Sequence, residues 1–164
     1  MNLFMEKHNI KQAGVPADLN LAGLTGARVK LDGAFKCAVV VSMGDSVGAA
    51  VDFSLQQHDA ASAGTSKALN IVRNYYRKAD VETAFTKVEI RPDDAGLSDS
   101  VDLAAVFAAA EGIVVFEVLA EDLDRENGFG WISLNIGDPG AAKVFNAEYV
   151  LRDNRQEPAY DQDL

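Results

Sequence analysis

The chain has a single cysteine, Cys37, among its 164 residues. One thiol cannot form an internal disulfide, so a small fold held together by disulfides is excluded. Cys37 stands in an alternating apolar run, and we expect it to be buried as a small hydrophobic side chain.

Positive charge is also scarce. Lys and Arg total 15 against 25 Asp and Glu, which gives a formal net charge of -10. A negative field of this size repels phosphate backbones, so we expect no direct contact with nucleic acid.

Long apolar runs are missing as well. None approaches the roughly 20 residues of a membrane-spanning helix, so we expect no membrane partner. The opening MNLFMEKHNIK lacks the basic start and continuous apolar stretch of a signal peptide. These features predict a soluble protein synthesised in a cytoplasm.

Motifs for catalysis are not evident. His8 and His58 have no cysteine or carboxylate at zinc-ligand spacing, and we expect both histidines to be solvated. The serines Ser42, Ser46 and Ser54 lack Gly-x-Ser-x-Gly surroundings, and no glycine-rich segment ends in Gly-Lys-Ser/Thr. We therefore expect no enzyme, no catalytic residue and no cofactor.

One acidic segment partly matches a calcium loop. Asp122, Asp124 and Glu126 alternate as Asp-x-Asp-x-Glu and could offer oxygen ligands. An EF-hand loop needs glycine at its sixth position and glutamate at its last, where this chain has Asn127 and Ser133. We interpret the segment as a solvated loop and expect no metal site.

Two further features have a chemical alternative. The carboxylates at Asp93-Asp94 and Asp99/Asp102 lie among Ala, Gly and Ser, whereas a glycosidase acid needs an apolar pocket. Trp131 could stack on a sugar, but it lies in register with Phe129, and we favour core packing for it.

Alternating hydrophobicity is the strongest signal that the chain does contain. In Ile113–Ile136, two apolar runs flank an acidic segment that ends in Asn127-Gly128, a pair that tolerates positive φ. Side chains alternate across a strand, so Val114, Phe116 and Val118 share one face. We predict a β-hairpin here.

The rest of the chain repeats this pattern at short intervals. The alanine-rich segment 103–111 predicts one short helix, and His58–Lys67 has the composition of an exposed loop. Short connections imply antiparallel pairing. The sequence predicts an all-β fold, an antiparallel β-sandwich or a jelly-roll-like barrel of roughly seven or eight strands. The other expected strands lie around residues 29–31, 35–41, 51–55, 68–78, 85–90 and 145–151.

We divide the chain into an N-terminal arm (residues 1–26), a β-sandwich domain (27–152) and a C-terminal tail (153–164). Apolar side chains in the arm are costly to leave in water. They contact either a partner or the core of their own domain, and both alternatives stay open. The candidate partner-binding residues are Leu3, Phe4, Met5 and Ile10.

Two segments of the chain form a recurring set of β motifs. A strand ending in Gln56-Gln57 precedes the loop residues Gly64–Leu69, and Glu121–Asp124 leads to the closure Asn127-Gly128-Phe129. With these motifs the chain resembles a family of small structural proteins encoded beside the major capsid protein in tailed bacteriophages. The similarity covers most of the chain, and its motifs are β-structure motifs without a catalytic signature.

This resemblance implies a capsid decoration, or cement, protein on the virion exterior. The implied partners are the major capsid protein and further copies of this chain, with a trimer favoured over a dimer. The alternatives are a neck or tail component of the phage, or a carbohydrate-binding β-sandwich on the virion.

Overall fold

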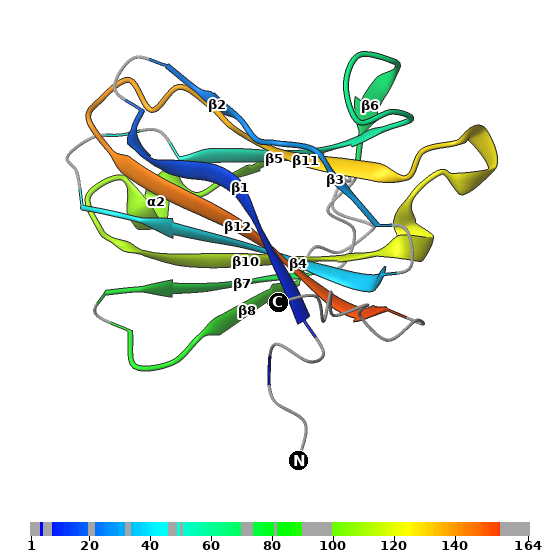
Figure 1. The fold of residues 1–164 in the computed structure, drawn as a ribbon. Helices are drawn as coiled ribbons and strands as arrows, with labels where there is room; N and C mark the ends of the chain where they lie inside the picture. The colour runs from blue at the N-terminus through cyan, green and yellow to red at the C-terminus, as the bar shows by residue number, and fades with distance from the viewer. Residues whose placement is uncertain are drawn as a thin grey trace, which may run out of the picture.

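The computed structural model describes residues 4, 8–19, 22–31, 34–45, 49, 51–69, 74–80, 82–89 and 100–154. These residues form two antiparallel β-sheets packed face to face (Figure 1). The first sheet has the order β1-β12-β4-β10-β7-β8. Its strands are β1 (His8–Asp18), β4 (Ala34–Met43), β7 (Asn74–Ala79), β8 (Thr86–Glu89), β10 (Gly112–Leu119) and β12 (Val144–Asn154).

The second sheet is shorter and has the order β2-β11-β5-β6, with β3 also pairing with β11 and β9 with β5. Its strands are β2 (Leu24–Thr25), β3 (Val29–Lys30), β5 (Asp52–His58), β6 (Ser66–Ala68), β9 (Ser100–Asp102) and β11 (Trp131–Ile136). The all-β sandwich is therefore confirmed. Within the described residues the two sheets stay open and do not close into a barrel.

The core lies between the sheets and is built from alternate residues of each strand. Val39 and Val41 on β4, Phe116 on β10 and Phe53 on β5 have no exposed surface. The ring centroids of Phe53 and Phe116 are 5.8 Å apart, which joins the two sheets at the centre. Cys37 is also fully buried, as expected, and burial raises the pKa of its thiol to about 12.

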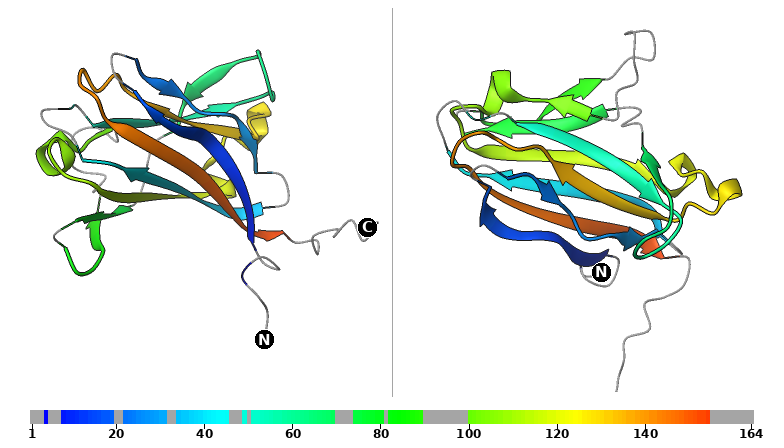
Figure 2. Two further views of the ribbon diagram at one scale, coloured as in Figure 1. Left: turned by 60° about the vertical axis from the view of Figure 1, so that its left-hand side comes forward. Right: turned by 90° about the horizontal axis from the view of Figure 1, so that it is seen from above.

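The predicted hairpin at Ile113–Ile136 is wrong. β10 pairs with β4 and β7 in the first sheet, whereas β11 pairs with β2, β3 and β5 in the second. The segment between them is a crossing between sheets, with two short 3-10 turns, η1 (Ala120–Asp122) and η2 (Arg125–Asn127). Figure 2 shows this crossing at one end of the sandwich.

Specific contacts hold the crossing in place. Leu123 is 5% exposed and belongs to the core, so the chain passes through the space between the layers. The Arg125 guanidinium donates to the Leu31 carbonyl oxygen at 2.9 Å, and the Asp124 backbone N–H donates to Gln57 Oε1 at 2.9 Å. Gly128 has φ of 84°, so the positive φ expected at the Asn-Gly pair is found at its glycine.

The predicted short helix is confirmed as α2, which spans Ala104–Phe107. It closes one end of the sandwich by placing Phe107 in the core without exposed surface. Lys143, which is 1% exposed, donates to the carbonyl oxygens of Gly44, Phe107 and Ala110 at 2.8–3.0 Å. Burial lowers the pKa of this ammonium, and the nearby charge of Asp45 opposes that effect.

Most of the described part of the arm belongs to the domain. β1 pairs with β12 from His8↔Arg152 to Asp18↔Val144 and forms one edge of the first sheet. Ala13 on β1 is 2% exposed and lies in the core. Of the two alternatives left open by the sequence, residues 8–18 therefore follow the one in which a strand completes the domain.

Tyr149 links the two sheets by a buried hydroxyl. From β12 this hydroxyl donates to the Ala27 carbonyl oxygen and accepts the Leu134 backbone N–H, both at 2.9 Å. Gly26 permits the close approach, because a Cβ there would lie 2.7 Å from the Leu134 carbonyl oxygen. The hydroxyl thus satisfies two backbone groups where the layers meet.

Tyr149→Phe should lower the free energy of unfolding by about 1–3 kcal/mol, because it leaves the Leu134 N–H and the Ala27 carbonyl without this partner. The change is measured by urea denaturation. Tyr75→Phe is the matched control, since Tyr75 is 8% exposed in the same sheet and its hydroxyl has no hydrogen bond within the described residues. Equal losses in both variants would contradict a special role for Tyr149.

Candidate functional site

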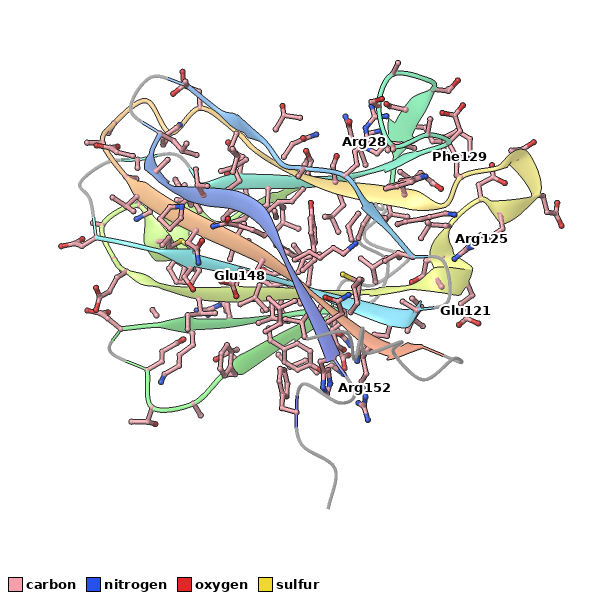
Figure 3. The ribbon with its side chains drawn as sticks, in the orientation of Figure 1. Arg28, Glu121, Arg125, Phe129, Glu148 and Arg152 are labelled. Atoms are coloured by element: carbon pink, nitrogen blue, oxygen red, sulfur yellow. The ribbon has the colours of Figure 1, made fainter. Side chains whose placement is uncertain are left out.

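A group of polar side chains joined by hydrogen bonds and an ion pair lies at one end of the second sheet. There the β5–β6 loop, residues 59–65, meets the crossing between β10 and β11. Figure 3 shows Arg28, Arg125 and Phe129 at this end of the molecule. The sequence singled out both segments as solvated loops, and the structure brings them together.

His58 is the most buried titratable group of this cluster. Phe53 and Leu55 on β5 face the core, so the alternation places His58 on the outer side of the sheet. It is nevertheless 3% exposed, with Nδ1 2.7 Å from Ser66 Oγ and Nε2 2.8 Å from Ser133 Oγ. The prediction of a solvated His58 is wrong, because β6 folds back and encloses the ring.

The surroundings of His58 favour its neutral form. Burial lowers the pKa of the imidazole, the positive charge of Arg28 lowers it further, and Asp59 acts in the opposite direction. Ser133 is 1% exposed. The Ser133 hydroxyl is therefore enclosed, whereas Ser66 on β6 is exposed, and the His58 ring joins the two by hydrogen bonds.

Arg28 fixes the β5–β6 loop. Its guanidinium donates to the carbonyl oxygens of Ala60 at 2.9 Å and Ala63 at 2.6 Å, and to Ser66 Oγ at 3.4 Å. The Ala63 carbonyl belongs to a backbone turn in which Ala63 itself has a φ of 56°. Such a conformation costs about 1–2 kcal/mol for a residue with a Cβ. The guanidinium contacts help to offset that cost.

Lys67 connects β6 to the crossing. Its ammonium forms an ion pair with Asp124 and lies 4.4 Å from the ring centroid of Phe129. Asn127 Nδ2 also donates to both carboxylate oxygens of Asp124. The hydrogen bond from Lys67 is the main cause that lowers the pKa of Asp124, and the bond from Asn127 adds to it.

The carboxylates of the partial calcium motif have other partners. Asp124 faces Lys67 and Asn127, and the Asp122 carboxylate accepts the Leu119 backbone N–H at 2.9 Å. Among the described residues, no three His, Cys, Asp or Glu side chains are grouped as metal ligands. Asp102 accepts the Ala104 N–H at 2.8 Å at the start of α2, whereas Asp93, Asp94, Asp99 and Ser46 lie outside the described residues.

Trp131 lies on the outer side of the second sheet, which corrects the expectation that it packs in the core. It is partly exposed and stands in register between Lys30 and His58, while its neighbour Ile132 faces inward with no exposed surface. Phe129, in contrast, is 7% exposed. β11 begins at Trp131, and Phe129 still belongs to the crossing. The two residues therefore do not share a strand, and their spacing of two positions does not place them on the same face.

The candidate partner-binding residues are only partly within the described chain. Phe4 is 56% exposed and stacks on His8 with ring centroids 4.1 Å apart, and Ile10 on β1 is 41% exposed. Leu3 and Met5 lie outside the described residues. Val15, also on β1, is 63% exposed, so apolar side chains do reach solvent along this edge strand.

Sequence reasoning missed Lys143 and the network of His58. Lys143 follows the turn Gly137–Gly140, where Gly140 has φ of 66°, and nothing in the local pattern indicates burial. Both residues are buried because backbone from distant segments surrounds them. For His58, one feature of the sequence could have indicated a place in the sheet: it is the last residue of a regularly alternating segment.

Comparison with known proteins adds little to these observations. No family model and no curated protein matches the chain. Among solved structures, a chain described as SPBc2 prophage-derived protein YomS is similar over 87% of this chain and 92% of its own length. The TM-score is 0.43 and the sequence identity is 8%, so the similarity carries no argument about function. Within the described residues, no helix is long and apolar enough to span a membrane.

Acidification should destabilise the fold through His58. The unfolded chain has the ordinary histidine pKa near 6.5 and the folded chain a lower one, so the unfolded state binds the proton more readily. This contribution to stability is present above about pH 6.5 and is lost as the pH falls through that value. It is measured as the free energy of unfolding at several pH values.

In His58→Gln this part of the pH dependence should disappear, whereas His8→Gln removes the other histidine and should retain it. Carboxylate titration is common to all three proteins and cancels in the comparison. Identical pH profiles for wild type and His58→Gln would show that His58 titrates alike in both states.

Proposed function

We propose that this chain is a non-enzymatic structural protein of a tailed-phage virion that binds the outer surface of the capsid. In this role it stabilises contacts between subunits of the major capsid protein, as a decoration or cement protein. The proposal rests on the sequence resemblance and on one observation about surface. Apolar side chains that could serve a partner, led by Phe4 and Ile10, are exposed along an edge strand.

The use of the ordered polar groups supports a binding role over a catalytic one. His58 bonds to the buried Ser133 and to the exposed Ser66, and Asp124 is held by Lys67 and Asn127. Groups held in this way stiffen the end of the sandwich, and a stiff domain loses little conformational freedom when it binds.

Charge supports an outer location. A chain with net charge -10 is repelled by packaged DNA and disfavoured in the capsid interior. On the outside, many weak contacts summed over a symmetric shell can bind strongly together, since linked sites raise one another's effective concentration. We propose that the protein is made in the host cytoplasm and assembles on the capsid as a homo-oligomer.

A double variant, Phe4→Ser with Ile10→Thr, should reduce occupancy on purified capsids. Both positions are exposed, so the apolar contact is lost while the pairing of β1 with β12 is retained. Truncating exposed contacts of this size weakens binding by about 1–2 kcal/mol, or roughly tenfold. Occupancy is quantified as the ratio of this chain to the major capsid protein on particles that have been separated from unbound protein.

Val144→Thr is the control, because Val144 is 48% exposed at the opposite end of the β1–β12 pair. Undiminished occupancy of the double variant would eliminate the role of Phe4 and Ile10. The stoichiometry of wild-type particles separates the phage alternatives, since a neck or tail component is present in far fewer copies than a decoration protein.

Carbohydrate binding is the second candidate, because Trp131 is partly exposed on the flat outer side of the second sheet beside Lys30. An aromatic face in this setting can stack on a sugar ring. If this function is right, Trp131→Ala should abolish glycan-array binding while circular dichroism shows an intact fold. Absence of glycan binding by the wild-type protein would remove the candidate.

A further inference from the structure

The outer face of the first sheet carries an unexpected band of apolar side chains. Because side chains alternate along a strand, the buried residues of β4, β10 and β12 determine which of their neighbours point outward. Outward positions of a sheet that faces water on one side are normally polar. Here the central positions are Tyr76, Ile113, Val115, Val40, Ala38 and Val150, all of them partly exposed.

The strand register joins these side chains into one surface. Val115 pairs with Val40 on one side and with Tyr76 on the other, so the three lie in a row across β7, β10 and β4. Ala38 pairs with Val150, which pairs with Ile10 on β1. We call the surface formed by the six central positions the apolar band; Ile10 lies beside it, at the β1 edge.

Within the described residues, nothing covers the apolar band. α2 lies at one end of the sandwich, and the second sheet packs against the opposite, inner face (Figures 1 and 2). Strands that are apolar on both sides are typical of sheets buried between two layers. β10, with the sequence GIVVFEVL, has that pattern, although only its inner side is buried by this chain.

Charges around the band decide what can approach it. The outward positions include both signs, and the Lys36 ammonium forms an ion pair with Glu117 on the face itself. Lys87 pairs with Glu89 at 2.9 Å near the β8 edge. In Figure 3, Glu148 and Arg152 lie on β12. The basic positions on this face are Lys36, Lys78, Lys87 and Arg152, and the acidic ones are Asp18, Glu89, Glu117 and Glu148.

The face therefore carries equal numbers of positive and negative side chains, and the net charge of -10 of the whole chain lies on the remainder of its surface. Two copies of so acidic a chain repel each other through most of their surfaces. When two copies meet through this face, their electrostatic repulsion is smallest and the area of buried apolar surface is largest. In a closed two-fold contact both copies use the same surface, so a second copy of this chain brings a face with both properties.

The dimensions are suitable for such a contact. Six strands about 4.8 Å apart span about 24 Å, and four outward rows about 7 Å apart cover about 20 Å along the strands. The projected footprint is roughly 500 Å², and side-chain relief increases the accessible area. Stable interfaces bury about 800 Å² per partner, so most of this face would be used.

We propose that the outer face of the first sheet, centred on Val40 and Val115, is the surface through which two copies of this chain associate about a two-fold axis. This inference rests on the homo-oligomer of the proposed function and specifies it as a face-to-face pair, in place of the trimer that the sequence resemblance favours. It does not depend on the identity of the particle, because the association is a property of the purified protein.

The test is the concentration dependence of molar mass, measured by sedimentation equilibrium on the full chain without capsids. The wild-type protein should form dimers. Val40→Lys and Val115→Lys should each raise the dissociation constant at least tenfold, since each places an unpaired ammonium in the centre of a buried contact. Ser54→Lys is the matched control, because Ser54 is partly exposed on the outer side of a central strand of the second sheet and should leave the dimer unchanged.

Val40→Thr provides a milder variant that keeps the β-branched shape and should still weaken the dimer measurably. Thermal unfolding of each variant verifies that the fold is intact. A monomeric wild-type protein at its highest attainable concentration would overturn the proposal, as would a dimer that both lysine variants leave intact, or a trimer. Capsid occupancy is measured separately, so its failure would affect the decoration role and leave this result standing.

Discussion

The structure depends on burying two apolar sheet faces against each other, and the chain achieves this by repeatedly crossing between the layers. β4 and β5, β10 and β11, and β11 and β12 are neighbours in sequence that lie in different sheets. Each crossing places a strand opposite its predecessor, so the aromatic side chains of Phe53, Phe116 and Phe145 meet in the middle. Long-range contacts of this kind connect the whole domain into one core.

The crossings also determine where polar groups can be satisfied. A chain that leaves one layer for the other carries backbone groups that no strand pairs, and buried groups without partners are costly. Side chains supply those partners at both ends. At one end, Gln57 accepts the Asp124 backbone N–H of the β10–β11 crossing, and Arg125 of that crossing donates to the Leu31 carbonyl oxygen. At the other end, the Lys143 ammonium donates to three carbonyl oxygens.

The polar side chains at the end of the second sheet are used within the domain. Arg28 binds the β5–β6 loop, His58 bonds to Ser66 and Ser133, and Lys67 joins β6 to the β10–β11 crossing. Apolar side chains, in contrast, are exposed along the β1 edge and partly exposed in the apolar band of the first sheet. These two surfaces are the ones that we propose for binding to the capsid and to a second copy of this chain.

The sequence by itself determined the all-β class, the antiparallel pairing, the short helix and which side chains of β4, β5, β10 and β12 share a face, because alternation depends only on residues two apart in one strand. It did not determine which strands are partners. Residues 113–136 satisfy the local rules for a hairpin, yet the burial of Leu123 and the bond from Arg125 to Leu31 direct the chain to the other sheet. The same limit explains His58 and Trp131, since His58 bonds to Ser133 on β11 and Trp131 lies between β3 and β5, all pairings between segments distant in sequence. Local pattern fixes the faces of a strand, and only tertiary packing decides what each face meets.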